Sequence, residues 1–504
     1  MLFNSSEFIF LFLPAAVAMH FALARFGVAA AATGTTIASL AFYAWWNPAF
    51  LPLPILSIAF NFLLARQIVS SPKRLARPLA IIGIVINLLV LGYFKYADFL
   101  LSLVDGHVPA APYVPLALSF TTFVQIAFLV DVYRRRPSIE FPSYALFVAF
   151  FPHLIAGPIV RWSELGPQIA DATRYRIDWN NVAQGLTIFT FGLGKKLLVA
   201  DPLGPHVAPV FDAAARGEPV MALAAWSAAF AYSAQLYFDF SGYSEMAIGL
   251  GLLFNLRLPI NFAAPFRATS IIDLWRRWHI SLSRFLRDFV YVPLGGARHG
   301  VHRRTFNLLA TMTLGGLWHG AAWTFVMWGA FHGLLLAANH AWRSWRGNIE
   351  PTLVRRFFGW LATFLVFVIG MVLFRATDLG TATRLFAAMA GFGNAPVPQR
   401  VLLDWDQWGI VQGYIPEHLV VEWFGATWSV VGSLWTLGAL AIALLAPDTL
   451  EICDYREGEP HSDWRRRWPA HWTPAPAWLA VVAVLFFAVF QALGRVSEFL
   501  YYQF

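Results

Sequence analysis

The chain has 504 residues, of which 58% are hydrophobic and only 13% are charged, whereas soluble domains carry about 25% charged residues. Its mean hydropathy is +0.58, and no polar linkers divide it into separate soluble cores. The composition excludes an ordinary soluble protein. It predicts an all-α, polytopic transmembrane helical protein that forms one integral membrane domain over residues 1–504.

The formal net charge of +8 could indicate binding to nucleic acid, but the distribution of the basic residues argues against it. Basic residues gather in short loops next to apolar runs, as the positive-inside rule describes for cytoplasmic loops. If the spans alternate, the loop at 376–428 and both termini face the other side. We therefore expect a multi-pass protein of the bacterial inner membrane with periplasmic termini, a periplasmic loop at 376–428, and no nucleic-acid partner.

Apolar runs near the length needed to cross a bilayer recur along the whole chain. Two further segments, 143–160 and 305–342, are apolar but irregular: the first contains Pro152 and Gly157, and the second is about long enough for two crossings. Irregular backbone at membrane depth needs protein or a water-filled cavity around it, so either segment could be re-entrant. The expected total is about 10 to 13 membrane segments. The ten regular runs are 7–24, 29–46, 50–65, 79–94, 114–132, 182–200, 221–250, 357–374, 429–446 and 476–494.

Residues 256–304 form an unusually basic stretch, with nine arginines against two aspartates. Within it, apolar residues at three- and four-residue spacing predict one interfacial helix over 270–292. This helix could be a basic membrane anchor alone. It could also be a cytoplasmic funnel for an anionic cofactor, because arginine binds phosphate in a bidentate manner. The candidate cofactor-binding residues are Arg276, Arg277, Arg284, Arg287, Trp275 and Trp278.

His319 lies in an apolar segment between Gly315-Gly316 and Gly320. Ionisable side chains at such depth are costly and mark functional sites, and histidine is well suited to act as a general base near neutral pH. The glycines would let a substrate approach the backbone closely. His279 lies in the basic stretch, where spacing alone favours a structural role. His332 could line the same cavity as His319 or hydrogen-bond a neighbouring helix, and the second reading is favoured.

Acidic and hydroxyl side chains end the apolar run at 221–250, where Asp239 needs a cationic partner that the basic stretch could supply. Asp239 is either part of a structural ion pair or a channel residue. The candidate cavity-lining residues are Asp239, Ser241, Tyr243, Trp318 and His332. The single Cys453 excludes intrachain disulfides and cysteine-based metal clusters, and no metal site is expected.

These motifs together resemble the membrane-bound O-acyltransferase family, in particular its bacterial alginate O-acetylation branch. The resemblance rests on residues 151–161, 237–251, 275–296 and 315–333, on the opening Met1 to Ser6, and on the tail Tyr501 to Phe504. Two departures are mild. Glu245 stands where aspartate is expected, and 272–274 reads Ile-Asp-Leu where Thr-Glu-Phe is expected.

The resemblance implies tilted helices around a central tunnel, with His319 as the catalytic histidine and His279 as its companion. It implies acetyl-CoA as the acyl donor, with no permanently bound cofactor. It further implies O-acetylation of an exopolysaccharide such as alginate through a periplasmic SGNH-type O-acetyltransferase. Two alternatives remain at this stage. One is D-alanyl or other acyl transfer to a cell-envelope polymer, and the other is a transporter or flippase, which the lack of repeated halves disfavours.

Overall fold

The computed structural model describes residues 1–105, 114–347, 352–393, 421–423, 426–428, 430–455, 471–493 and 499–500. The chain divides into two compact units. The first unit contains residues 1–194, 242–261 and 449–503, and the second contains residues 195–241 and 262–448. The helix α12 (Ala222–Leu253) contributes to both units, since the division passes between Ser241 and Gly242.

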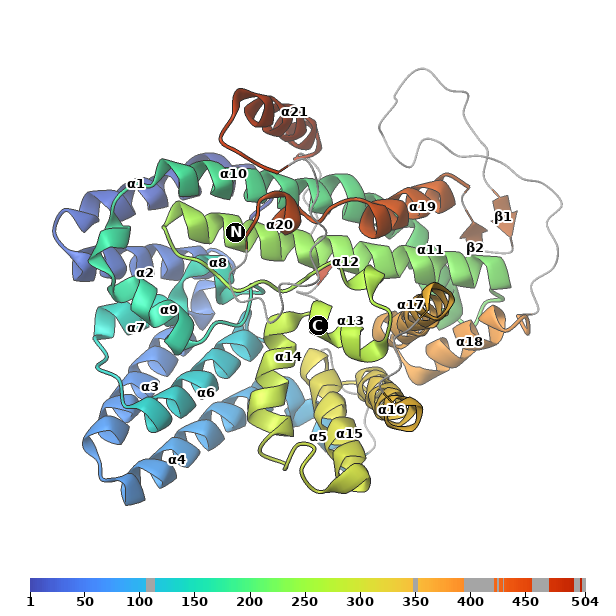
Figure 1. The fold of residues 1–504 in the computed structure, drawn as a ribbon, viewed down its shortest axis with the longest axis horizontal. Coiled ribbons are helices and arrows are strands. Elements are labelled where there is room, and N and C mark those ends of the chain that lie inside the picture. Colours follow the sequence, from blue (N-terminus) through green and yellow to red (C-terminus); the bar gives the residue numbers. More distant parts are fainter. Residues whose placement is uncertain are drawn as a thin grey trace. The chain divides into compact units, whose positions relative to one another are not determined.

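The regular elements described in the first unit are all helices (Figure 1). Each of the predicted apolar runs at 7–24, 29–46, 50–65, 79–94 and 114–132 is confirmed as a helix or as two consecutive helices. The elements of this unit are η1 (Phe8–Phe12), α1 (Leu13–Ala24), α2 (Val28–Ala44), η2 (Pro48–Phe50), α3 (Pro52–Ser70), α4 (Lys73–Leu91), η3 (Gly92–Tyr96), α5 (Ala97–Asp105), α6 (Leu118–Arg135), α7 (Phe141–Ala149), α8 (Phe151–Leu154), α9 (Trp162–Ala170), η4 (Ala172–Tyr175), α10 (Trp179–Gly194), α20 (Thr449–Ile452) and α21 (Pro476–Ala492).

The second unit is also helical apart from one short antiparallel hairpin, in which Glu422 pairs with Thr427. It contains the helices that carry the candidate site. Its elements are η5 (Lys195–Ala200), η6 (Asp201–Leu203), α11 (Gly204–Ala215), η7 (Pro265–Arg267), α13 (Ile271–Arg277), α14 (Ile280–Leu286), η8 (Arg287–Tyr291), α15 (Gly300–His319), α16 (Trp323–Arg346), α17 (Leu353–Arg375), α18 (Leu379–Met389), β1 (Val421–Trp423), β2 (Ala426–Trp428) and α19 (Val430–Leu445).

Several of these helical stretches are long and apolar enough to cross a membrane. Among the described residues, five such stretches are found, at Pro48–Ser70, Lys73–Val104, Trp179–Ala215, Leu353–Arg375 and Val431–Ile452. Shorter apolar helices lie at Phe8–Ala24, Val28–Ala44 and Pro476–Ala492. The chain is therefore a multi-pass membrane protein of the all-α class, and the total of 10 to 13 segments stays a prediction.

The two irregular segments fold as the sequence indicates. The first is a broken helix, because the backbone turns at Phe150 (φ −53°, ψ 109°) between α7 and α8. The second forms two consecutive helices, α15 and α16, joined by residues 320–322. Whether either segment is re-entrant depends on the membrane, so that expectation stays a prediction.

The single interfacial helix predicted over 270–292 is wrong. The helix α13 ends at Arg277, Trp278 is extended, and His279 adopts a left-handed conformation (φ 43°, ψ 56°) before α14 begins. Tertiary contacts override the local periodicity here. The carbonyl of Arg277 accepts a hydrogen bond from the Ala263 amide at 3.0 Å, and the Trp278 ring is buried against Phe262.

Glycines set the close packing of α15 against α16. A Cβ atom on Gly316 would lie 3.0 Å from the Gly329 amide nitrogen and would also collide with the Phe325 carbonyl. A Cβ atom on Gly333 would lie 2.9 Å from the Leu309 Cα. Gly329 and Gly333 are four residues apart, which is the small-residue spacing that lets membrane helices approach closely. Gly316, Gly329 and Gly333 therefore allow the close packing of α15 against α16, and the approach of a substrate to the backbone near Gly315, Gly316 and Gly320 stays a prediction.

The predicted periplasmic loop at 376–428 is described only in part. It includes α18 and the hairpin of β1 and β2. Residues 394–420, with Trp405 and Trp408, lie outside the described residues, as does the aromatic tail at 501–504.

Candidate active site

His279 and His319 come together in the second unit, with ring centroids 6.5 Å apart and ring planes at 54°. His279 precedes α14, and His319 is the last residue of α15. Both side chains are buried. The separation is too large for direct ring packing. It suits one small reacting group hydrogen-bonded to both imidazoles, since such bonds span about 2.6–3.2 Å.

The position of His279 depends on an unusual backbone conformation. A left-handed residue other than glycine costs about 1–2 kcal/mol, although histidine tolerates this region better than most residues do. The imidazole edge meets the Phe240 ring of α12 at a centroid distance of 4.8 Å and an angle of 89°. Strained backbone concentrates at functional sites. This feature was not visible in the sequence, which placed His279 inside a continuous helix.

Aromatic rings from three helices surround His319. Trp318 precedes it on α15, at a centroid distance of 5.0 Å. Trp328 of α16 stands perpendicular to its ring at 5.3 Å, and Phe374 of α17 meets it at 5.0 Å. The centroid of Trp318 also lies 6.2 Å from that of His279. An apolar wall of this kind limits the access of water to the imidazole and thereby strengthens electrostatic interactions within the site.

His332 lies one aromatic layer behind His319. Its ring contacts Trp328 at 4.9 Å and Trp275 of α13 at 5.2 Å. Neither ring nitrogen has a hydrogen-bond partner among the described residues. The favoured reading of His332, a hydrogen bond to a neighbouring helix, is therefore wrong for the part of the chain that the structure describes. The ring packs instead against α13 and α17, where a Cβ atom on Gly370 would lie 2.9 Å from its Nε2.

Asp239 forms a buried ion pair one residue before Phe240. Its carboxylate accepts a hydrogen bond from the Lys196 ammonium at 2.6 Å, and Lys196 also lies 2.8 Å from Asp201. The expected partner from the basic stretch is thus replaced by a lysine of η5. Two adjacent lysines within an otherwise apolar run were the signal that could have identified it. Lys195 is paired in turn with Asp448 at 3.1 Å.

The four candidate donor-binding arginines differ in their surroundings. Arg277 is held by Asp273 at 2.8 Å, and Arg287 is held by the adjacent Asp288 at 2.7 Å. Arg276 is exposed and Arg284 is half-buried. Arg277 thus stabilises α13. The four guanidinium groups differ in their exposure and in their ion pairs.

The aromatic candidates and the remaining polar candidates also differ in their surroundings. Trp275 contacts His332 and Trp328, whereas Trp278 is buried against Phe262 and Phe367 as part of the core. Ser241 is buried, and its hydroxyl has no hydrogen-bond partner among the described residues. Tyr243 belongs to the first unit, where it stacks on Phe3 at 4.9 Å.

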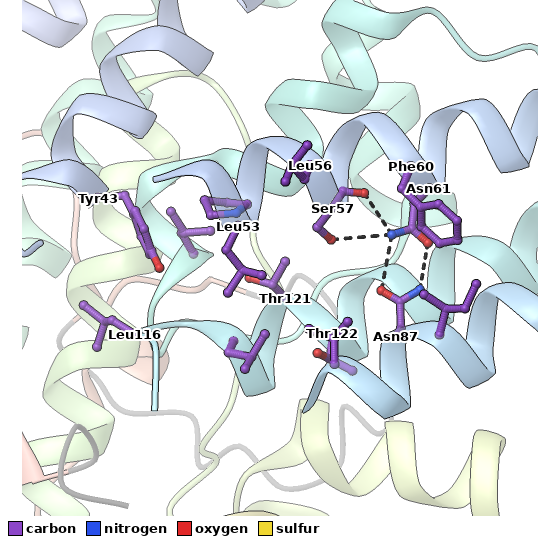
Figure 2. Close-up of a pocket in the computed structure, with 15 residues that line it drawn as sticks. Tyr43, Leu53, Leu56, Ser57, Phe60, Asn61, Asn87, Leu116, Thr121 and Thr122 are labelled. Atoms are coloured by element: carbon purple, nitrogen blue, oxygen red, sulfur yellow. Dashed lines mark hydrogen bonds between the residues drawn. The ribbon is translucent and has the colours of Figure 1, made fainter. Parts of the chain in front are cut away.

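A pocket of about 260 Å³ lies within the first unit between α2, α3, α4 and α6 (Figure 2). Its most polar feature is the buried pair Asn61 and Asn87, whose side-chain amides donate to each other at 3.2 and 2.8 Å. Asn61 also donates to the Ser57 carbonyl, and Asn87 donates to the Gly83 carbonyl. These amides satisfy one another and cross-link α3 to α4. The pocket is otherwise mainly apolar, and its described lining contains no histidine, aspartate, glutamate, lysine or cysteine.

Comparison with known proteins agrees with this arrangement. Residues 115–377, which include both histidines, match the model of the membrane-bound O-acyltransferase family. The chain is 39% identical to a peptidoglycan O-acetyltransferase of Helicobacter pylori, over 78% of this chain and 80% of that protein. It is 41% identical to a probable alginate O-acetylase of Azotobacter vinelandii, over 78% of this chain and 79% of the relative.

A third relative, a probable alginate O-acetylase of Pseudomonas syringae pv. tomato, is 36% identical over the full length of both chains. The family model covers more than half of the chain, and these relatives extend over most of the rest. The chain therefore belongs to the membrane-bound O-acyltransferase family and is an O-acyltransferase.

Proposed function

We propose that the chain transfers an acetyl group from acetyl-CoA at the site formed by His279 and His319. The observation that carries this proposal is the facing of two buried imidazoles at 6.5 Å inside an aromatic wall. Acetyl transfer fits the relatives, which are named for O-acetylation of peptidoglycan and alginate.

In the proposed reaction, His319 accepts the proton of an acceptor hydroxyl while that oxygen attacks the thioester carbonyl. The new C–O bond forms as the C–S bond breaks, and the proton held by His319 passes to the leaving thiolate of coenzyme A. His279 donates a hydrogen bond to the carbonyl oxygen as negative charge develops on it. The surrounding rings exclude water, which would otherwise hydrolyse the thioester.

The phosphates of the donor require cationic groups. Arg276 is the first candidate, because it is exposed, whereas Arg277 and Arg287 hold carboxylates of their own segment. Bidentate binding of phosphate is the chemistry for which arginine is suited. We propose that this end of the site faces the cytoplasm of a bacterial inner-membrane protein whose termini are periplasmic.

The acceptor is proposed to be a cell-envelope polysaccharide of the alginate type, reached through a periplasmic SGNH-type O-acetyltransferase. The supporting facts are the names of the relatives and the membrane-spanning helices. D-alanyl transfer from a carrier protein is the second hypothesis within the same enzyme class.

The test is the release of free coenzyme A from acetyl-CoA by the full-length protein in proteoliposomes. The variant His319→Ala should lose this activity. The matched control His302→Ala removes an exposed histidine from the same helix and should keep it. Activity of the wild-type protein only with a D-alanyl carrier protein, and none with acetyl-CoA, would replace the proposal with the second hypothesis.

A further inference from the structure

A cleft of about 990 Å³ opens within the second unit, and none of the candidate site residues lines it. It lies between the end of α16, the start of α17 and the start of α13. Four arginines line this arginine cleft, and its described lining contains no aspartate or glutamate. The arginines are Arg343 and Arg346 of α16 and Arg355 and Arg356 of α17.

Positive charge accumulates around the arginine cleft. Arg343 and Arg355 are exposed. The ring of His340, on the same turn of α16, is within electrostatic reach of Arg343, Arg276 and Arg304. The exposed guanidinium groups of Arg343 and Arg355 therefore present positive charge to an anionic ligand.

The deeper walls of the arginine cleft are apolar. Ile271, Leu335 and Val366 line it together with Ala338 and Ala362. A ligand that fills the cleft must therefore carry both an anionic group and an apolar portion. Inorganic phosphate has no apolar portion that would use these walls.

Large exposed aromatic side chains surround the mouth of the arginine cleft. Trp342 and Trp345 are 55% and 78% exposed, and Phe357 and Phe358 on α17 are 54% and 61% exposed. The helix α17 is one of the stretches able to cross a membrane. Aromatic residues beside arginines at the end of such a helix are typical of the level of the lipid headgroups.

We propose that the arginine cleft binds an anionic phospholipid, with its phosphate headgroup at Arg343 and Arg355 and an acyl chain along the apolar walls. Basic pockets between membrane helices are suited to anionic headgroups, and each arginine near the membrane surface contributes about fivefold to such binding. This site is separate from the histidine pair, and its occupancy does not depend on the proposed acetyl transfer.

The test uses the full-length purified protein and measures the retention of phosphatidylglycerol against phosphatidylcholine by native mass spectrometry. The double variant Arg343→Gln/Arg355→Gln should bind phosphatidylglycerol about 25-fold more weakly, with phosphatidylcholine unchanged. The matched control Arg134→Gln/Arg135→Gln removes two exposed charges from the end of α6 and should stay within about twofold of wild type.

A second variant keeps the test decisive if the double variant folds poorly. Ala362 is exposed in the cleft wall, so Ala362→Phe fills the apolar part without entering the core and should also weaken retention. Equal retention by wild type and both variants would overturn the proposal, and so would equal losses in the arginine variant and its control. Displacement of phosphatidylglycerol by equimolar coenzyme A would instead assign the arginines to a soluble phosphate donor.

Discussion

The Phe240 ring meets the imidazole of His279 edge-on, with a centroid distance of 4.8 Å. The preceding residue, Asp239, forms the buried ion pair with Lys196. Because Asp239 and Phe240 both lie on α12, the ion pair fixes the part of this helix that supports His279. The ion pair of Asp239 and Lys196 and the candidate catalytic His279 are thus linked through two adjacent residues of α12.

Removing one charge of this pair should therefore weaken the fold. Lys196→Met leaves Asp239 as a buried carboxylate without its closest cation, which costs about 3–5 kcal/mol. Thermal unfolding of the protein in detergent should show a clear fall in Tm. The exposed pair Arg216 and Glu218 is the control, since Arg216→Met should leave the Tm nearly unchanged.

The double variant Lys196→Met/Asp239→Leu distinguishes the lost charge balance from lost packing. It should recover part of the stability, because apolar groups replace the two buried charges, while Asp201 still loses its contact with Lys196. A double variant as unstable as Lys196→Met would contradict this account of the pair.

The glycine contacts between α15 and α16 predict a second effect on stability. Gly316→Ala should destabilise the protein, because the added Cβ meets the Gly329 backbone at 3.0 Å and the Phe325 carbonyl. Gly438→Ala on α19 is the matched control. A Cβ there meets nothing within 4 Å, so alanine should stabilise the helix by up to about 1 kcal/mol. Equal shifts in Tm for the two variants would rule out the packing argument.

The left-handed backbone of His279 predicts that stability and activity separate at this position. His279→Gly should be more stable than His279→Ala by about 1–2 kcal/mol, since glycine adopts this conformation without strain. Both variants should lose turnover by about 10²–10³-fold, the usual effect of removing one donor to a developing oxyanion. If His279→Gly kept wild-type turnover, His279 would have no role in the reaction.

His332 predicts a stabilising substitution. Its buried ring nitrogens lack hydrogen-bond partners among the described residues, and each buried polar atom in that state costs about 1–3 kcal/mol. His332→Leu should raise the Tm in detergent. A fall in Tm would mean that another group satisfies the imidazole.

The sequence was sufficient to identify the helices, because long apolar runs and their glycines are local signals. It also identified both members of the histidine pair. It could not show the break at His279, since the apolar spacing over 270–292 continues in phase while the Ala263 amide and the burial of Trp278 end α13. Phe240, Trp328 and Phe374 reach the site from three different helices, so no single stretch of sequence places them together.

The partner of Asp239 was missed for the same reason. The basic stretch holds nine arginines and attracts attention as a source of charge. The cation that pairs with Asp239 is Lys196, 43 residues earlier in the chain. Only the fold shows that a lysine of an apolar run, rather than a nearby arginine, meets this carboxylate.

The most direct test of the account is the rate of coenzyme A release from acetyl-CoA by His319→Gln in proteoliposomes. Glutamine keeps a polar side chain of similar size but cannot act as a general base. We expect the rate to fall by about 10²–10⁴-fold, with an unchanged Tm in detergent and with wild-type rates for His302→Ala. A His319→Gln protein that releases coenzyme A at the wild-type rate would contradict the assignment of His319 as the catalytic base.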